Sequence, residues 1–142
     1  MDFEKHTTKY LVKSEDLNHH GTLFAGRSCE WFVTSGFIAV AFNLEPSNIV
    51  CLKVHGNEFL HPVRAGQIIC YSAQIVRTGR STLTVYVEAR DYRDESILVS
   101  RGFITFCYVD QNTHSTPHGL VFVPTTAQQI ELNAQAVLLN KR

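Results

Sequence analysis

The chain has 142 residues, and its 13 basic and 13 acidic side chains give a formal net charge of zero. This length has room for one hydrophobic core rather than two independent ones. The balanced charge leaves no strong positive field to gather nucleic acid or anionic lipid, so neither nucleic acid nor a membrane is expected as a partner.

The N-terminal half predicts a strand, a polar loop and a buried helix. Residues 6–13 are β-prone, and a polar turn follows that ends at Gly21. From about Ala25 to Phe42 the chain is almost uniformly apolar and has no proline, which is typical of a helix buried on nearly every side. We therefore expect a curved sheet to wrap this helix from more than one direction.

The chain after Pro46 predicts strands. In 81–90 the apolar residues alternate with polar ones, so this strand should have one face in the core and one wet face. A C-terminal helix is expected at about 125–139, capped by Thr125 or Thr126. Strands are expected at 49–54, 67–76 and 81–90. Turn-like connectors at 78–80 and 92–95 predict that three long strands form an antiparallel meander ending at Val109. This layout predicts a single α+β domain over 1–142, with one long central helix and an antiparallel β-sheet.

The composition and residue spacing indicate the cellular compartment and whether a metal or cofactor is expected. The four cysteines are scattered without a Cys-x-x-Cys pair, and the N-terminus lacks the apolar run of a secretory signal, so a cytoplasmic location is expected. The longest near-apolar stretch, 31–44, is too short to span a bilayer. Histidine, cysteine and carboxylate groups do not occur at familiar metal-ligand spacing, so we expect no metal and no other cofactor.

The most informative motif is the loop from Asn18 to Gly26, which reads Asn-His-His-Gly-Thr-Leu-Phe-Ala-Gly. It resembles the Asn-x-x-Gly-x-x-Phe-Gly-Gly loop of hotdog-fold acyl-CoA thioesterases, with Ala25 replacing the first glycine of the pair. A later stretch, 54–66, is similar to that family's strand and Pro-Val-x-x-Gly-Asp turn, with Gln67 in the acidic position. The resemblance implies a hotdog fold and hydrolysis of acyl-CoA thioesters to free acid and CoA.

The resemblance and the residues agree on where the chemistry lies. Free amides at a helix N-terminus can polarise a thioester carbonyl. Gly26 has no side chain, so an acyl group can approach the backbone closely there. A glycine that is kept only for packing is an equal alternative. Glu30, one turn later, is the candidate nucleophile or base. The family places its acid at the level of Val33, so we expect Glu30, on the same helical face, to have taken over. The alternative is a salt-bridged Glu30 without a catalytic role.

Further candidates are implied mainly by resemblance. Asn18 would orient the thioester or the water, unless it only forms a turn. Thr22, Glu30 and His55 are similar to the Thr, Glu and His set of fluoroacetyl-CoA thioesterases, and His20 joins His55 among the expected substrate-binding residues.

A turn at Gly79 is the expected contact for CoA. Arg77, Arg80 and Ser81 flank it, at the place where CoA phosphates contact the related enzymes, and arginine suits phosphate by charge and geometry. Solvated turn charges are the alternative for either arginine taken singly.

Two other functions stay open from the sequence. One is a hotdog hydroxyacyl-thioester dehydratase, although the loop before the helix lacks the proline typical of that class. The other is a non-catalytic acyl-CoA-binding module, because Val33 carries no acid. One hotdog unit leaves a sheet edge unpaired, so we expect a homodimer, with further assembly into a tetramer or hexamer left open.

Overall fold

The computed structural model describes residues 3–141, so Met1, Asp2 and Arg142, which the single-domain prediction includes, lie outside the described residues. Within these described residues, five strands form one antiparallel sheet in the order β1-β3-β4-β5-β2. The predicted meander is confirmed, because β3, β4 and β5 pair in sequence. The elements are β1 His6–Leu11, α1 Ala25–Ala41, β2 Ile49–Phe59, β3 Ile68–Thr78, β4 Thr82–Asp91, β5 Leu98–Tyr108 and α2 Ala127–Leu139, with short 3-10 turns at Ser14–Asp16 and Pro46–Asn48.

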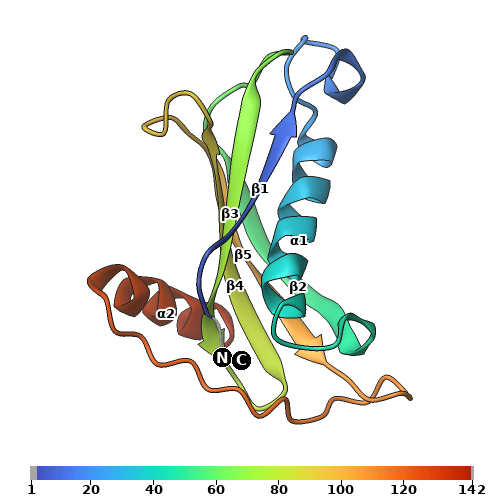
Figure 1. Cartoon of the computed structure of the whole chain (residues 1–142), viewed down its shortest axis with the longest axis vertical. Coiled ribbons are helices and arrows are strands. Elements are labelled where there is room, and N and C mark those ends of the chain that lie inside the picture. The colour runs from blue at the N-terminus through green and yellow to red at the C-terminus, as the bar shows by residue number, and fades with distance from the viewer. Residues whose placement is uncertain (1–2, 142) are drawn as a thin grey trace.

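The two helices lie on opposite faces of the sheet (Figure 1). The long α1 contacts all five strands, and the shorter α2 packs mainly on β3. Most of the buried apolar side chains, with Phe32 and Tyr71 among the largest, form the core between α1 and the sheet. A second, smaller cluster under α2 contains Tyr86, Phe103 and Leu132. The described residues include no helix that is both long and apolar enough to cross a membrane.

The expected wet face of β4 is only partly correct. The apolar positions from Leu83 to Ala89 face the α1 core as the alternation predicts. On the other face, however, Thr84 and Tyr86 are buried as well, because α2 covers this part of the sheet. Glu88 and Arg90, farther along the strand, are half-buried and form an ion pair at 3.2 Å.

The helix α1 is covered on one side only within the chain. Its sheet-facing residues are fully or nearly fully buried, as Phe32 and Ala39 illustrate. On the side that faces away from the sheet, Glu30 and Thr34 are exposed. The expectation of a helix buried on nearly every side is therefore corrected for the single chain: the sheet curves past α1 but does not enclose it.

The strand β2 forms a free, irregular edge of the sheet. It pairs with β5 on one side only, and its register shifts between Cys51 and Lys53 and again between Val54 and Asn57. Gly102 on β5 permits the second shift, since a side chain there would collide with the backbone of β2 at Gly56. Several apolar side chains of this edge are exposed, namely Val50, Leu52, Val54 and Phe59.

Candidate active site at the start of the long helix

The loop that leads into α1 is organised by the side chain of Asn18. Its Oδ1 accepts hydrogen bonds from the backbone N–H groups of His20 at 2.8 Å and Thr22 at 3.2 Å, and its Nδ2 donates to Oγ1 of Thr22 at 3.1 Å. Gly21 has a φ of 77°, a left-handed conformation that favours glycine. Asn18 and Thr22 thus hold the loop together, and His20 lies exposed on it.

The backbone amides at the N-terminus of α1 are not capped by a side chain. The residue at the cap position is Phe24, which has no side-chain acceptor to offer. The first N–H groups of a helix lack partners inside the helix, so those around Gly26 are available to a ligand. Gly26 is exposed, and a side chain at this position would collide with the ring of Phe24, which is itself exposed. The helix dipole adds to the attraction that this turn exerts on negative charge.

Glu30 lies one turn after Gly26, on the side of α1 that faces away from the sheet. Its side chain is 64% exposed, and its Oε2 accepts a 3.4 Å hydrogen bond from Arg27. The expectation of a helix buried on nearly every side therefore does not hold at Glu30 in the single chain. The helix is apolar where it meets the sheet, and Glu30 is on the opposite side.

Arg27 connects Glu30 to a buried carboxylate that sequence reasoning missed. Its Nε lies 3.1 Å from Oδ1 of Asp16, whose side chain is only 5% exposed. The other oxygen of Asp16 accepts the backbone N–H of Lys13 at 2.9 Å. The Arg27–Glu30 pair could have been found from its i, i+3 spacing. Asp16 could not, because its contact with Arg27 depends on how the loop folds back against the helix.

At the helix position where the resembled family has its acidic residue, this chain has Val33. Val33 is half-buried and packs against the core. Beside it on the helix, Cys29 accepts a 3.6 Å hydrogen bond from Nδ2 of Asn57 on β2. The Oδ1 of Asn57 is buried and has no hydrogen-bond partner among the described residues. A polar strand residue therefore approaches α1 where the resembled family has its carboxylate.

His55 lies on the other face of the sheet, away from Glu30. Its Nε2 is 2.7 Å from Oγ1 of Thr105, which in turn is 2.9 Å from Oγ1 of Thr84 under α2. Burial lowers the pKa of His55, and the positive charges of Lys53 and Arg77 lower it further. Within one chain the structure therefore does not bring His55 together with Thr22 and Glu30.

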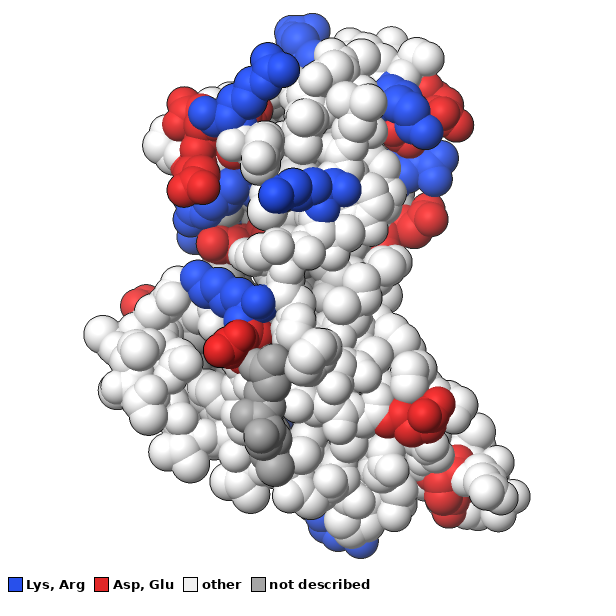
Figure 2. All heavy atoms as spheres, in the orientation of Figure 1, with Lys and Arg blue, Asp and Glu red and all other residues white. Residues whose placement is uncertain are grey.

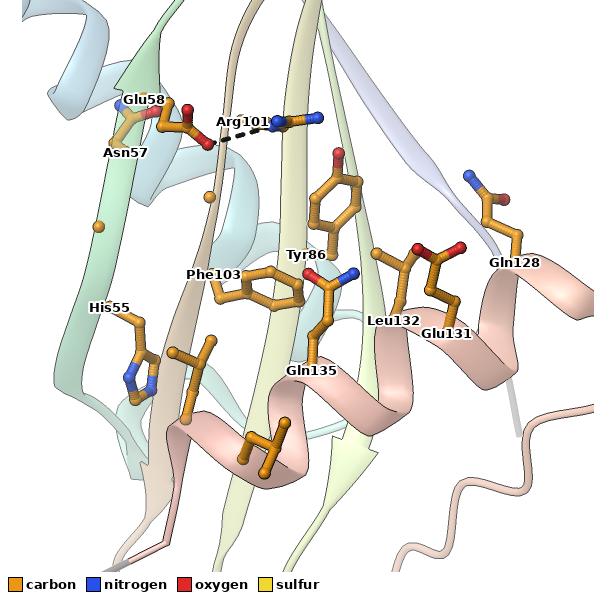
Figure 3. Close-up of a pocket in the computed structure, with 14 residues that line it drawn as sticks. His55, Asn57, Glu58, Tyr86, Arg101, Phe103, Gln128, Glu131, Leu132 and Gln135 are labelled. Atoms are coloured by element: carbon orange, nitrogen blue, oxygen red, sulfur yellow. Dashed lines mark hydrogen bonds and ion pairs between the residues drawn. The ribbon is translucent and has the colours of Figure 1, made fainter.

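The surroundings of His55 are a groove of about 980 Å³ between α2 and the sheet (Figure 3). Tyr86 and Phe103 lie on its floor, and Glu131 and Gln135 reach toward it from α2. At one end Arg101 pairs with Glu58 at 3.3 Å. This groove has the size of a ligand site, but it is separate from the uncapped end of α1.

The turn between β3 and β4 lies at the opposite end of the sheet from the start of α1 (Figure 1). Arg77 is half-buried, and its guanidinium donates to Thr82 Oγ1 at 3.1 Å, while burial lowers its pKa. Arg80 is exposed and Ser81 is half-buried. One chain therefore gathers Asn18, His20, Thr22, Gly26 and Glu30, but holds Arg77, Arg80 and Ser81 far from them.

Comparison with known proteins shows which family this chain belongs to. Residues 20–97, more than half of the chain, match the thioesterase superfamily. A relative named as an uncharacterized acyl-CoA thioester hydrolase, YkhA of Bacillus subtilis, is 26% identical over 125 residues, covering 86% of this chain and 72% of the relative. The chain therefore belongs to the thioesterase superfamily, and the resemblance drawn from the Asn18 loop is confirmed.

Solved structures agree on the fold. An acyl-CoA hydrolase from Staphylococcus aureus, in complex with butyryl-CoA and CoA, superimposes with a TM-score of 0.82 at 22% identity, covering 95% of this chain and 83% of that one. A hexameric thioesterase from Yersinia pestis has a TM-score of 0.69 at 25% identity, covering 78% of this chain and 91% of that one. Both support the predicted α+β fold of the hotdog thioesterases.

Proposed function

We propose that this thioesterase hydrolyses acyl-CoA thioesters at the uncapped start of α1. The observation that carries the proposal is the exposed Gly26 turn, with free amides and a carboxylate one turn away. Amides preorganised in this way stabilise the oxygen of a thioester carbonyl as it becomes negative. The relatives, which are named acyl-CoA thioester hydrolases, support the same substrate class.

Glu30 supplies the base or the nucleophile. As a base, its carboxylate takes a proton from water, the hydroxide adds to the carbonyl carbon, and the C–S bond breaks to release free acid and the thiolate of CoA, which takes up the proton. As a nucleophile, it attacks the carbonyl carbon itself, and the C–S bond breaks to expel the thiolate of CoA. Water then hydrolyses the resulting anhydride to the free acid and Glu30, whose proton passes to the thiolate. In both routes the negative oxygen lies at the amides near Gly26, and Asn18 keeps their loop in shape.

Arg27 and Asp16 act as positioning residues for this carboxylate. Glu30 is exposed, so a free side chain would sample many rotamers. The contact with Arg27 restricts it, and Arg27 is itself held by the buried Asp16. The pair biases the direction of Glu30.

A second copy completes the site. The free edge of β2 can pair with the same strand of another copy in an antiparallel, two-fold arrangement. This pairing would bring the β3–β4 turn of one copy, with Arg80, toward the start of α1 in the other, since the two lie at opposite ends of the sheet. Each chain then acts as one domain in a homodimer, and the cytoplasmic location stays a prediction.

The absence of an acid at Val33 favours one alternative, a module that binds acyl-CoA without turnover. A purified sample incubated with a panel of short and long acyl-CoA esters decides between the two. Free acid and CoA should be measured by chromatography, because Cys51 is exposed and would itself react with a thiol dye. Release of free CoA supports hydrolysis, whereas CoA binding in a calorimeter without release supports the module. Water addition to an enoyl-CoA would identify a dehydratase instead.

A further inference from the structure

The groove between α2 and the sheet has the size of a small-molecule site and takes no part in the proposed hydrolysis. Its volume is about 980 Å³, and it lies on the face of the sheet opposite α1. On the side of α2 its lining includes Leu138 and Leu139, which are 64% and 37% exposed. Apolar side chains that stay accessible in such a groove favour a ligand whose apolar part covers them.

The floor of the groove is aromatic. The rings of Tyr86 and Phe103 lie next to each other, with centroids 5.1 Å apart and planes inclined by 54°. Figure 3 shows both rings on the sheet side of the groove. The hydroxyl of Tyr86 donates a 3.0 Å hydrogen bond to Glu88, which holds this ring in place. The face of an aromatic ring carries partial negative charge and attracts cations.

The charged side chains of the groove leave one negative charge uncompensated. Its charged lining consists of Glu58, Arg101 and Glu131. The Nε of Arg101 lies 3.3 Å from Oε1 of Glu58, so these two compensate each other. Within residues 3–141, Glu131 forms no ion pair. From residue 111 to residue 140 the sequence has no lysine or arginine, and the surface formed by α2 is mostly uncharged in Figure 2.

The two ends of the groove differ in charge. His55 lies at the end near the C-terminus of α2, where the positive charges of Lys53 and Arg77 act on its ring. A ligand cation is therefore favoured at the other end, beside Glu131. A carboxylate ligand is disfavoured there, because Arg101 already has a partner and Glu131 would repel a second negative charge.

We propose that this groove binds a small organic cation, an amine whose apolar body is an alkyl chain or an aromatic ring. The ammonium group pairs with Glu131 over the rings of Tyr86 and Phe103, and the apolar body covers the exposed leucines of α2. The amide oxygen of Gln135, which also lines the groove, accepts a hydrogen bond from the ammonium group. This binding goes beyond the proposed function and does not depend on hydrolysis.

A titration with three probes of similar shape and different charge tests the proposal. Phenethylamine is the cation, 2-phenylethanol the neutral compound and 3-phenylpropanoate the anion, all at neutral pH. Binding is followed by NMR of the leucine methyl groups. Phenethylamine should bind with a dissociation constant on the order of 1 mM and shift the methyl signals of Leu132, Leu138 and Leu139. The neutral compound should bind about threefold more weakly, and the anion more weakly still.

Three variants locate the charge that selects the cation. Glu131→Gln should weaken phenethylamine binding about threefold to fivefold, because it removes the uncompensated carboxylate. The matched control, Glu45→Gln, removes the same charge from an exposed position outside the groove and should leave the affinity unchanged. Arg101→Gln frees Glu58 and should strengthen phenethylamine binding about twofold.

Several results would overturn the cation site. These are equal binding of phenethylamine and 2-phenylethanol, the parent affinity in Glu131→Gln, or shifts confined to leucines outside the groove. Tighter binding of 3-phenylpropanoate that is lost in Arg101→Gln would show an anion site instead. Release of CoA from acyl-CoA esters, measured on the same samples, should be equal within about twofold in the parent and in Glu131→Gln. Phenethylamine binding without any CoA release would refute the proposed hydrolysis and leave the cation site intact.

Discussion

The contact between Arg27 and Asp16 should contribute far more to stability than the contact between Arg27 and Glu30. Asp16 is 5% exposed and Arg27 37% exposed, so their ion pair lies between a buried and a surface pair. Breaking a fully buried pair from one side costs about 3–5 kcal/mol, and an exposed pair contributes about 0–1 kcal/mol. We therefore expect Arg27→Met, which keeps most of the stem of the side chain, to lower the free energy of unfolding by about 2 kcal/mol. For a chain of this size that is a fall in Tm of about 8 °C.

A double-mutant cycle in urea tests this reasoning. Asp16→Asn and Arg27→Met, made singly and together, should show a coupling energy of about 1.5–2 kcal/mol. The matched cycle of Arg27→Met with Glu30→Gln should show less than about 0.5 kcal/mol, because Glu30 is 64% exposed and 3.4 Å away. Equal coupling in the two cycles would refute the idea that Asp16 anchors Arg27. Arg27→Met should also slow hydrolysis without raising KM, since it disturbs the direction of Glu30 and not the binding of CoA.

Three further predictions follow from the same structure. Glu30→Gln should keep the fold and the affinity for CoA while kcat falls by roughly a hundredfold, and full activity would show that water is activated elsewhere. Arg80→Ala should mainly raise KM for acyl-CoA, since it removes contact with a remote part of the substrate; a steep loss of kcat at constant KM would contradict a role in CoA binding. His55 has a pKa below 6.5 in the folded chain, so the unfolded chain takes up its proton first as the pH falls through 6.5, and stability should decrease from pH 7 toward pH 5. His55→Gln should flatten this decrease in chemical denaturation, and an unchanged slope would assign it to other groups.

The sequence predicted the local elements well because their signals are local. The alternation after Ser81 and the apolar run after Ala25 each depend on neighbouring residues only. The exposure of Glu30 was misjudged because an apolar run does not say which side of a helix meets the sheet. The burial of the second face of β4 was also missed. The helix α2 packs on that face through few large side chains, Leu132 among them, so the contact left little sign in the sequence.

In the candidate site, too, contacts with local sequence signals were predicted and contacts that depend on the fold were not. The loop from Asn18 to Gly26 was found because its residues are contiguous and carry a motif. The link from Asp16 through Arg27 was not found, since it forms only when the loop folds against the helix. The distance between this loop and Arg80 was also beyond sequence reasoning, because it is set by the direction in which β3 crosses the sheet.

The bends in β2 have a consequence for aggregation. A free, flat sheet edge is a hazard, because any extended strand can add to it and propagate into fibrils. The two register shifts beside Lys53 and Gly56 bend this edge, so that a flat strand cannot follow it along its whole length. The irregularity therefore disfavours the open-ended addition of foreign or unfolded strands at this edge.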